Sequence, residues 1–218
     1  MIKAVPAVLA CVALVGCGQD IAGTATWPGA RLDKAVLSAA DFPPGVQYDR
    51  ITEKPGEPDG EGGPGSMLSR PEGCANALTD VIAGSAQRGP GSAAKYAVSY
   101  DGARIVMTLL SWNLDLDTLR ATAERCATFE AFFDPDSPGI PITTTPLAGL
   151  DPDALAYQQT MTLRDAASNV FMAFQNIGTD ALFGVAFGTP DPSITIAARL
   201  PQTFLEVFSQ QVVKLRTS

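Results

Sequence analysis

Two segments in which every second residue is apolar flank Asp101-Gly102 in this chain of 218 residues. Asp-Gly is a favoured two-residue turn of a β-hairpin because both positions tolerate a positive φ. Folding about this turn brings the apolar side chains of both arms to one face, as the cross-strand pairs Tyr100–Ala103, Val98–Ile105 and Tyr96–Met107. Only one register brings this apolar set together, so residues 95–108 predict two paired antiparallel strands.

Three later segments show the same alternation and are separated by short polar turns. They predict a three-stranded antiparallel meander with one buried face, over residues 155–163, 169–177 and 181–187. We expect a first strand over residues 46–52. A sheet-edge strand is expected over residues 140–146, because its two prolines block a full hydrogen-bond ladder.

Apolar residues at helical spacing predict long helices over residues 72–83, 115–133 and 201–215. Pro71 and Pro201 suit the first turns of two of them, and Asp115 or Asp117 can cap the third. The spacing in Ser38-Ala39-Ala40-Asp41 predicts one capped helical turn. The fold class is therefore α+β, an antiparallel β-sheet with helices packed on one face.

Of the four cysteines, Cys11 lies within the apolar N-terminal segment and Cys17 directly follows it. Cys74 and Cys126 lie on the apolar faces of the first two expected helices. In an exported protein, such a pair predicts one helix-to-helix disulfide inside the core. The alternatives are two free buried thiols, or a metal site, which two thiols without histidine cannot complete.

The N-terminus combines a basic start with a short apolar run, the pattern of a secretory signal peptide. The run is about a dozen residues long, whereas a membrane-spanning helix needs about 20. The tetrapeptide Leu14-Val15-Gly16-Cys17 resembles the bacterial lipobox. This resemblance implies cleavage between Gly16 and Cys17, a diacylglyceryl group on the Cys17 thiol, and a location on the extracytoplasmic face of the cell membrane.

These features predict a signal peptide over residues 1–16, a lipidated N-terminus and tether over 17–32, and a single α+β domain over 33–218. Within that domain, residues 54–66 are rich in glycine and proline and predict a surface loop. Three acidic residues alternate in this loop. A calcium site is the alternative interpretation, but the loop lacks the closing bidentate glutamate of the known calcium loops.

The absence of histidine excludes Ser-His-Asp and Cys-His nucleophile systems and removes the commonest metal ligand. We therefore expect no catalytic residue, no metal and no cofactor. After removal of the signal peptide, the chain keeps all 23 acidic residues and 14 of its 15 basic ones, a net charge of −9. This balance excludes nucleic acid as a partner, because its binding requires clustered cations. The lipid remains as the link to the membrane.

Three features occur together: the lipobox, one cysteine in each of the first two expected long helices, and the start of the expected domain, Leu37-Ser38-Ala39-Ala40-Asp41-Phe42-Pro43. Together they resemble a family of mycobacterial envelope lipoproteins, similar to the extracellular sensor domain of the PknH-type serine/threonine kinases. The resemblance implies a sensor-like domain without catalytic residues. That kinase domain has a second disulfide, for which this chain has no cysteines.

Three functional classes follow. The first is a non-catalytic module that binds a ligand or an envelope protein. The second is a carrier of lipid or another small apolar ligand, similar to the LppX/LprG-type lipoproteins. The third is an enzyme with paired carboxylates, for which Asp115/Asp117 and Asp151/Asp153 are the candidates, although these residues suit helix caps and turns better.

Aromatic and methionine side chains of the meander are candidates to line an apolar ligand pocket. At strand period such side chains are more typical of a packed core. The set comprises Met161, Phe171, Met172, Phe174, Phe183 and Phe187.

Overall fold

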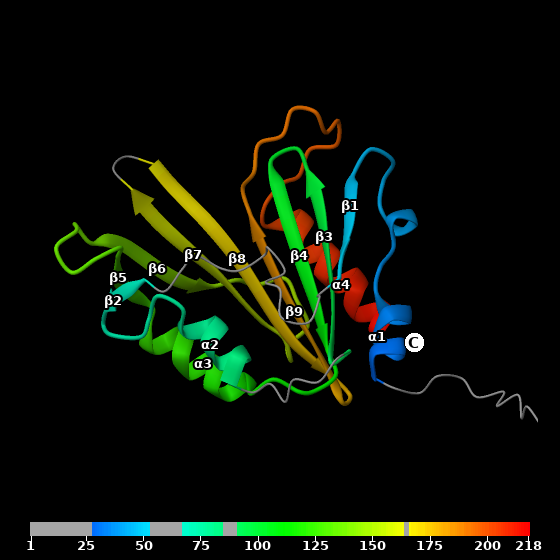
Figure 1. The fold of residues 1–218 in the computed structure, drawn as a ribbon, viewed down its shortest axis with the longest axis horizontal. Helices are drawn as coiled ribbons and strands as arrows, with labels where there is room; N and C mark the ends of the chain where they lie inside the picture. The colour runs from blue at the N-terminus through cyan, green and yellow to red at the C-terminus, as the bar shows by residue number, and fades with distance from the viewer. Residues whose placement is uncertain (1–27, 53–66, 85–90, 164–165) are drawn as a thin grey trace, which may run out of the picture.

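The computed structural model describes residues 28–52, 67–84, 91–163 and 166–218. Within these ranges, nine antiparallel strands form one sheet in the order β1-β3-β4-β9-β8-β7-β6-β5-β2 (Figure 1). The strands are β1 (Gln47–Ile51), β2 (Leu68–Arg70), β3 (Ala93–Tyr100), β4 (Ala103–Leu110), β5 (Thr128–Phe132), β6 (Ile140–Pro146), β7 (Leu155–Leu163), β8 (Ala166–Ile177) and β9 (Asp180–Phe187). The helices are α1 (Pro28–Ala35), the 3₁₀ turn η1 (Ala39–Asp41), α2 (Ala77–Gly84), α3 (Leu116–Arg125) and α4 (Gln202–Arg216).

The predicted hairpin is confirmed in its register. β3 and β4 pair through Tyr100 with Ala103, and the ladder continues through all the expected cross-strand pairs. Gly102 has a φ of +88°, the left-handed conformation that the two-residue turn requires. β1 pairs with the outer side of β3, so β1 is the edge strand and the hairpin lies next to this end of the sheet.

The predicted meander is also confirmed, as β7, β8 and β9. β8 begins at Ala166, a few residues earlier than expected. Its residues from Ala166 to Phe174 pair with β7. β9 pairs with β4 on its other side, through residues such as Phe183 opposite Thr108. This pairing joins the meander to the hairpin and makes the single sheet continuous.

The helices lie on both faces of the sheet, so the expectation of helices on one face is not confirmed. Successive residues of a strand point to opposite faces. In β8, Phe171 and Ala173 pack in one core cluster, whereas Met172 and Phe174 pack in another. Because all four side chains are buried, this strand needs helical cover on both sides.

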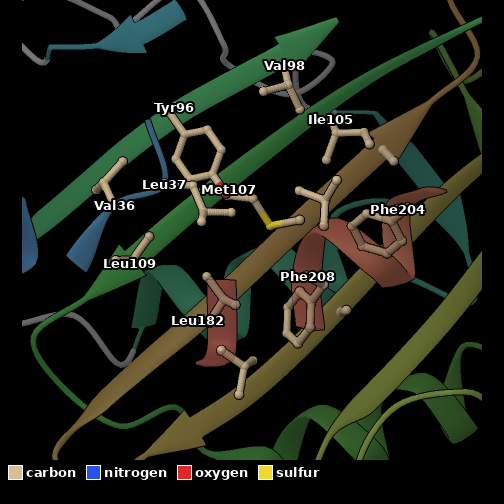
Figure 2. Packing of buried hydrophobic residues seen from close by; sticks show 14 of the residues in the cluster. Val36, Leu37, Tyr96, Val98, Ile105, Met107, Leu109, Leu182, Phe204 and Phe208 are labelled. Atoms are coloured by element: carbon tan, nitrogen blue, oxygen red, sulfur yellow. The ribbon is translucent and has the colours of Figure 1, made fainter. Parts of the chain in front are cut away.

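We call the first cluster the α4-side core. α4 and α1 contact each other and cover this face (Figure 1). Figure 2 shows Phe204 and Phe208 of α4 packed against the sheet with Met107 and Leu182. Gly184 of β9 allows this close approach, because a Cβ there would lie 2.8 Å from the Met107 sulfur and 3.0 Å from each phenylalanine ring.

The second cluster, the α3-side core, is covered by α2 and α3, which contact each other. Leu119 and Ala123 of α3 are buried on this side. Asp115 is the N-cap of α3, as the sequence allowed, because its side chain accepts a hydrogen bond from the Thr118 backbone nitrogen at 2.9 Å. α4 likewise confirms the predicted final helix.

The expected helix over residues 115–133 is too long. α3 ends at Arg125, and the chain continues as β5, in which Phe129 and Ala131 are buried at strand period. Phe129 also fits the helical stripe of Leu119, Ala123 and Cys126, so the sequence pattern was ambiguous, whereas Phe133, the last residue expected in that stripe, is 73% exposed. Pairing with β6 and β2 satisfies the backbone of this segment as a strand, and this tertiary contact decides its conformation.

The expected edge strand over residues 140–146 is instead an interior strand, β6. Its ladders are staggered: β5 pairs with the stretch from Ile140 to Thr143, and β7 with the stretch from Ile142 to Pro146. Pro141 therefore lies in one ladder only, and so does Pro146. The stagger explains how a strand with two prolines is paired on both sides.

The Cys74–Cys126 disulfide is present, with the Cα atoms 5.5 Å apart. It does not join two helices as expected. The predicted helix at 72–83 begins only at Ala77, so Cys74 precedes α2, and Cys126 is the C-cap of α3. Both cysteines are buried in a small third cluster with Phe129 and Ala131 of β5.

The described N-terminal part begins with α1, which lies partly in the expected tether of residues 17–32. Leu32 and Ala35 of this helix are fully buried in the α4-side core. The folded domain therefore starts earlier than predicted. Gly16 and Cys17, and the loop at 54–66, lie outside the described residues. No helix among the described residues is long and apolar enough to span a membrane.

Candidate functional site

A surface groove with a volume of about 220 Å³ lies between η1 and α4. Four separate parts of the chain contribute to it: the end of η1, the end of β3, the segment before α4, and α4 itself. It is lined by Asp41, Phe42, Pro43, Tyr100, Ala197, Thr203, Glu206, Val207 and Gln210. We call it the η1–α4 groove.

One face of α4 forms a wall of the groove. Glu206 and Val207 lie three and four residues after Thr203, and Gln210 lies four and three residues after them, so these side chains share one side of the helix. Val207 is buried and holds this wall to the α4-side core. Glu206 and Gln210 are exposed, and their side chains form no hydrogen bond or ion pair with the described residues.

The opposite wall is the predicted turn at Ser38–Asp41, which the structure confirms as η1. The Asp41 carboxylate accepts hydrogen bonds from the Ser38 backbone nitrogen at 2.6 Å and from Lys214 Nζ of α4 at 3.0 Å. These contacts lower the pKa of Asp41, the backbone bond to Ser38 contributing most. The wall therefore presents a stable carboxylate, and the Lys214 pair ties it to α4.

A buried glutamine holds the two walls at a constant separation. Gln211 of α4 donates a hydrogen bond from Nε2 to the Ala35 carbonyl oxygen at 2.7 Å. Its Oε1 accepts one from the Leu37 backbone nitrogen at 3.0 Å. Because Gln211 is fully buried, both bonds are shielded from water and fix the chain between α1 and η1 against α4.

Tyr100 lies between the two walls, at the end of β3. Its side chain is only 6% exposed and belongs to the α4-side core, yet the residue lines the groove. Its hydroxyl forms no hydrogen bond with the described residues. Burial, and secondarily the charge of Glu206, raise the pKa of Tyr100, so the hydroxyl remains a neutral donor next to a carboxylate.

The acidic pairs proposed from the sequence do not form a catalytic cleft. Asp115 caps α3, and Asp117 pairs with Arg120 on the exposed side of the same helix. Asp151 pairs with Arg216 of α4, and Asp153 is exposed. Among the described residues, no group of three or more acidic or cysteine side chains is arranged to hold a metal ion.

The apolar set proposed as a ligand pocket is divided between the two faces of the sheet. Phe171 packs in the α4-side core, whereas Met172, Phe174 and Phe183 belong to the α3-side core. The rings of Phe174 and Phe183 are stacked with centroids 5.1 Å apart. These residues therefore do not line one common pocket, and their alternation reflects core packing.

No known protein-family model matches the chain, and no curated protein sequence matches it. Its fold is similar to the extracellular domain of PknH from Mycobacterium tuberculosis, with 13% identity, a TM-score of 0.53, and coverage of 86% of this chain and 96% of that domain. The chain has a PknH-like fold. An uncharacterized protein from Mycobacterium smegmatis is 14% identical with a TM-score of 0.48, over 87% of this chain and 95% of that protein.

The sequence alone did not indicate the η1–α4 groove as a site. The stretch from Leu37 to Pro43 stood out only as a family-like motif, and three residues of this stretch line the groove. The residues of α4 predicted a helix, but only its buried side was assigned. The signal that could have indicated the groove is a second stripe on α4, formed by Thr203, Glu206 and Gln210. These residues are polar, follow helical spacing and lie next to the stripe of buried residues.

Proposed function

We propose that this protein is a lipid-anchored, non-catalytic binding module on the extracytoplasmic face of the cell membrane. The observation that carries the proposal is the PknH-like fold, because the similar domain is an extracellular one. The Cys74–Cys126 disulfide is consistent with an oxidising compartment. The Leu14-Val15-Gly16-Cys17 pattern supports the lipid anchor.

The η1–α4 groove is the binding site that we assign to this module. It combines a preformed shape, held by the buried Gln211 contacts, with polar groups that have no partner in the described residues. Small-molecule sites are typically concave, largely preformed and equipped with a few such polar groups.

We expect the Cys17→Ala variant to lose its membrane anchor. Without the thiol, no diacylglyceryl group can be attached, and the net negative charge of the chain provides no electrostatic attraction to an anionic membrane surface. Fractionation of cells that express the variant should show either a precursor of higher mass or protein in the soluble fraction. Normal membrane partitioning with a processed N-terminus would contradict the anchor. A Cys11→Ala variant is the matched control and should remain anchored.

Native mass spectrometry separates the binding module from a lipid carrier. For the exported protein without its anchor, purified in the absence of detergent, we expect the mass of the bare polypeptide. Extra mass that organic solvent removes would identify a bound lipid and would contradict the module in favour of a carrier. The measurement is direct because a carrier retains its apolar cargo when no membrane is present to receive it.

A further inference from the structure

We propose that the η1–α4 groove binds a small molecule with a primary ammonium group and neighbouring hydroxyl groups, of the chemical class of an amino sugar. This inference rests on the proposed function as a binding module and specifies the ligand of its site. It follows from three properties of the groove: its charge, its size, and its polar atoms that have no hydrogen-bond partner among the described residues.

The charge of the groove favours a cation. Two carboxylates line it, Asp41 and Glu206. The nearby cation Lys214 is engaged with Asp41, so this pair is neutral and Glu206 contributes one uncompensated negative charge. An anionic ligand would therefore meet net repulsion in the groove, whereas an ammonium group would form charge-assisted hydrogen bonds.

The unpartnered polar atoms specify hydrogen-bonding groups beside that cation. The three hydrogen bonds to Asp41 from described residues all reach Oδ2, which leaves Oδ1 as a free acceptor. The Tyr100 hydroxyl and the Gln210 amide can each donate and accept, and neither has a partner among the described residues. Tyr100 lines the groove although the residue is only 6% exposed, so packing fixes the position of its hydroxyl before a ligand binds.

The size and aromatic content of the groove restrict the class further. Its volume of about 220 Å³ is smaller than the pockets of drug-sized ligands, which begin at about 300 Å³. The rings of Phe42 and Tyr100 provide apolar surface beside the polar groups. A compact ring with hydroxyl groups on its edge and an ammonium substituent matches this combination, whereas a lipid chain would offer no charged partner to Glu206.

The test is a calorimetric titration of the purified full-length mature protein in a polyoxyethylene detergent, which carries neither sugar nor amine. The probes are D-glucosamine and D-glucose at about pH 6, where an amino group of this type is protonated. The two probes differ chiefly in one ammonium group. We expect saturable binding of glucosamine, and at least about tenfold weaker binding of glucose, the effect of losing one charge-assisted contact.

Three variants localise the effect. Glu206→Gln keeps the size of an exposed side chain and should weaken glucosamine binding about tenfold, because it removes the uncompensated charge. Tyr100→Phe removes only the hydroxyl and should weaken it several-fold, as expected for one hydrogen bond. Glu124→Gln, on the exposed side of α3, is the matched control and should bind as the wild type does.

Equal binding of glucose and glucosamine would overturn the ammonium assignment, and so would unchanged affinity of Glu206→Gln or the absence of binding heat with either probe. The thermal transition of each variant, measured beside its titration, verifies that weaker binding does not reflect unfolding. The titrations could show no selective binding while Cys17→Ala loses its anchor and native mass spectrometry gives the mass of the bare polypeptide. In that case the proposed function as a binding module stands, and only the assigned ligand class is wrong.

Discussion

Replacing both Cys74 and Cys126 by alanine is expected to lower the free energy of unfolding by about 4 kcal/mol. The disulfide joins residues 52 positions apart and therefore removes many conformations from the unfolded chain. It also joins the segment before α2 to the end of α3, where the described chain has few other buried apolar residues. The cluster around the two cysteines contains only Ala77, Phe129 and Ala131 as further buried members.

Chemical denaturation followed by tryptophan fluorescence measures this loss. The midpoint of the wild type should fall on addition of a reducing agent, whereas the double variant should not respond to it. Serine at both positions is a second variant and should be less stable than alanine, because each hydroxyl would be buried where Cys74 is 0% and Cys126 is 2% exposed. Equal stability of the wild type and the double alanine variant would contradict a stabilising role of the disulfide.

The Phe208→Ala variant is expected to lose about 3–5 kcal/mol of stability, the usual cost of removing a buried phenylalanine side chain. Phe208 is fully buried, and its ring lies against the sheet beside Phe204 and Met107 (Figure 2). The Phe208 ring packs so closely on Gly184 of β9 that a Cβ there would lie 3.0 Å from the ring. The cavity left by the ring should therefore collapse only in part.

Val213→Ala is the matched control on the same helix. Its side chain is 60% exposed, so its truncation should change stability by less than about 0.5 kcal/mol. Urea denaturation of the two variants under identical conditions makes the comparison. A loss below about 1 kcal/mol for Phe208→Ala would contradict the packing of α4 against this face of the sheet, because removing a buried phenylalanine side chain costs about 3–5 kcal/mol.

The register of the hairpin and the strand order of the meander could be predicted because their signals are local. Alternation with a period of two assigns each side chain to a face, and a two-residue turn such as Asp101-Gly102 allows a single register. The same applies to the turn at Ser38–Asp41 and to the N-cap at Asp115, which are built from contacts between residues three positions apart.

The segments that the sequence left ambiguous are those whose partners are distant in the chain. Phe129 fits a helical stripe and a strand equally well, and only the ladder with β6 makes it part of β5. The prolines at 141 and 146 suggested a sheet edge, but the staggered ladders of β6 remove the conflict. The face that each helix covers likewise depends on which strands become neighbours.

The sequence by itself determined the strand pairs joined by short turns, the final helix, the cysteine pair and the absence of histidine chemistry. Those features follow from local periodicity and from residue types. Only the tertiary structure decided the order of the nine strands, the covering of both sheet faces and the η1–α4 groove. The groove joins Asp41, Tyr100 and Glu206, which are far apart in the chain. Such residues acquire a common function only when packing of α4 on the sheet brings them together, because no local pattern encodes that contact.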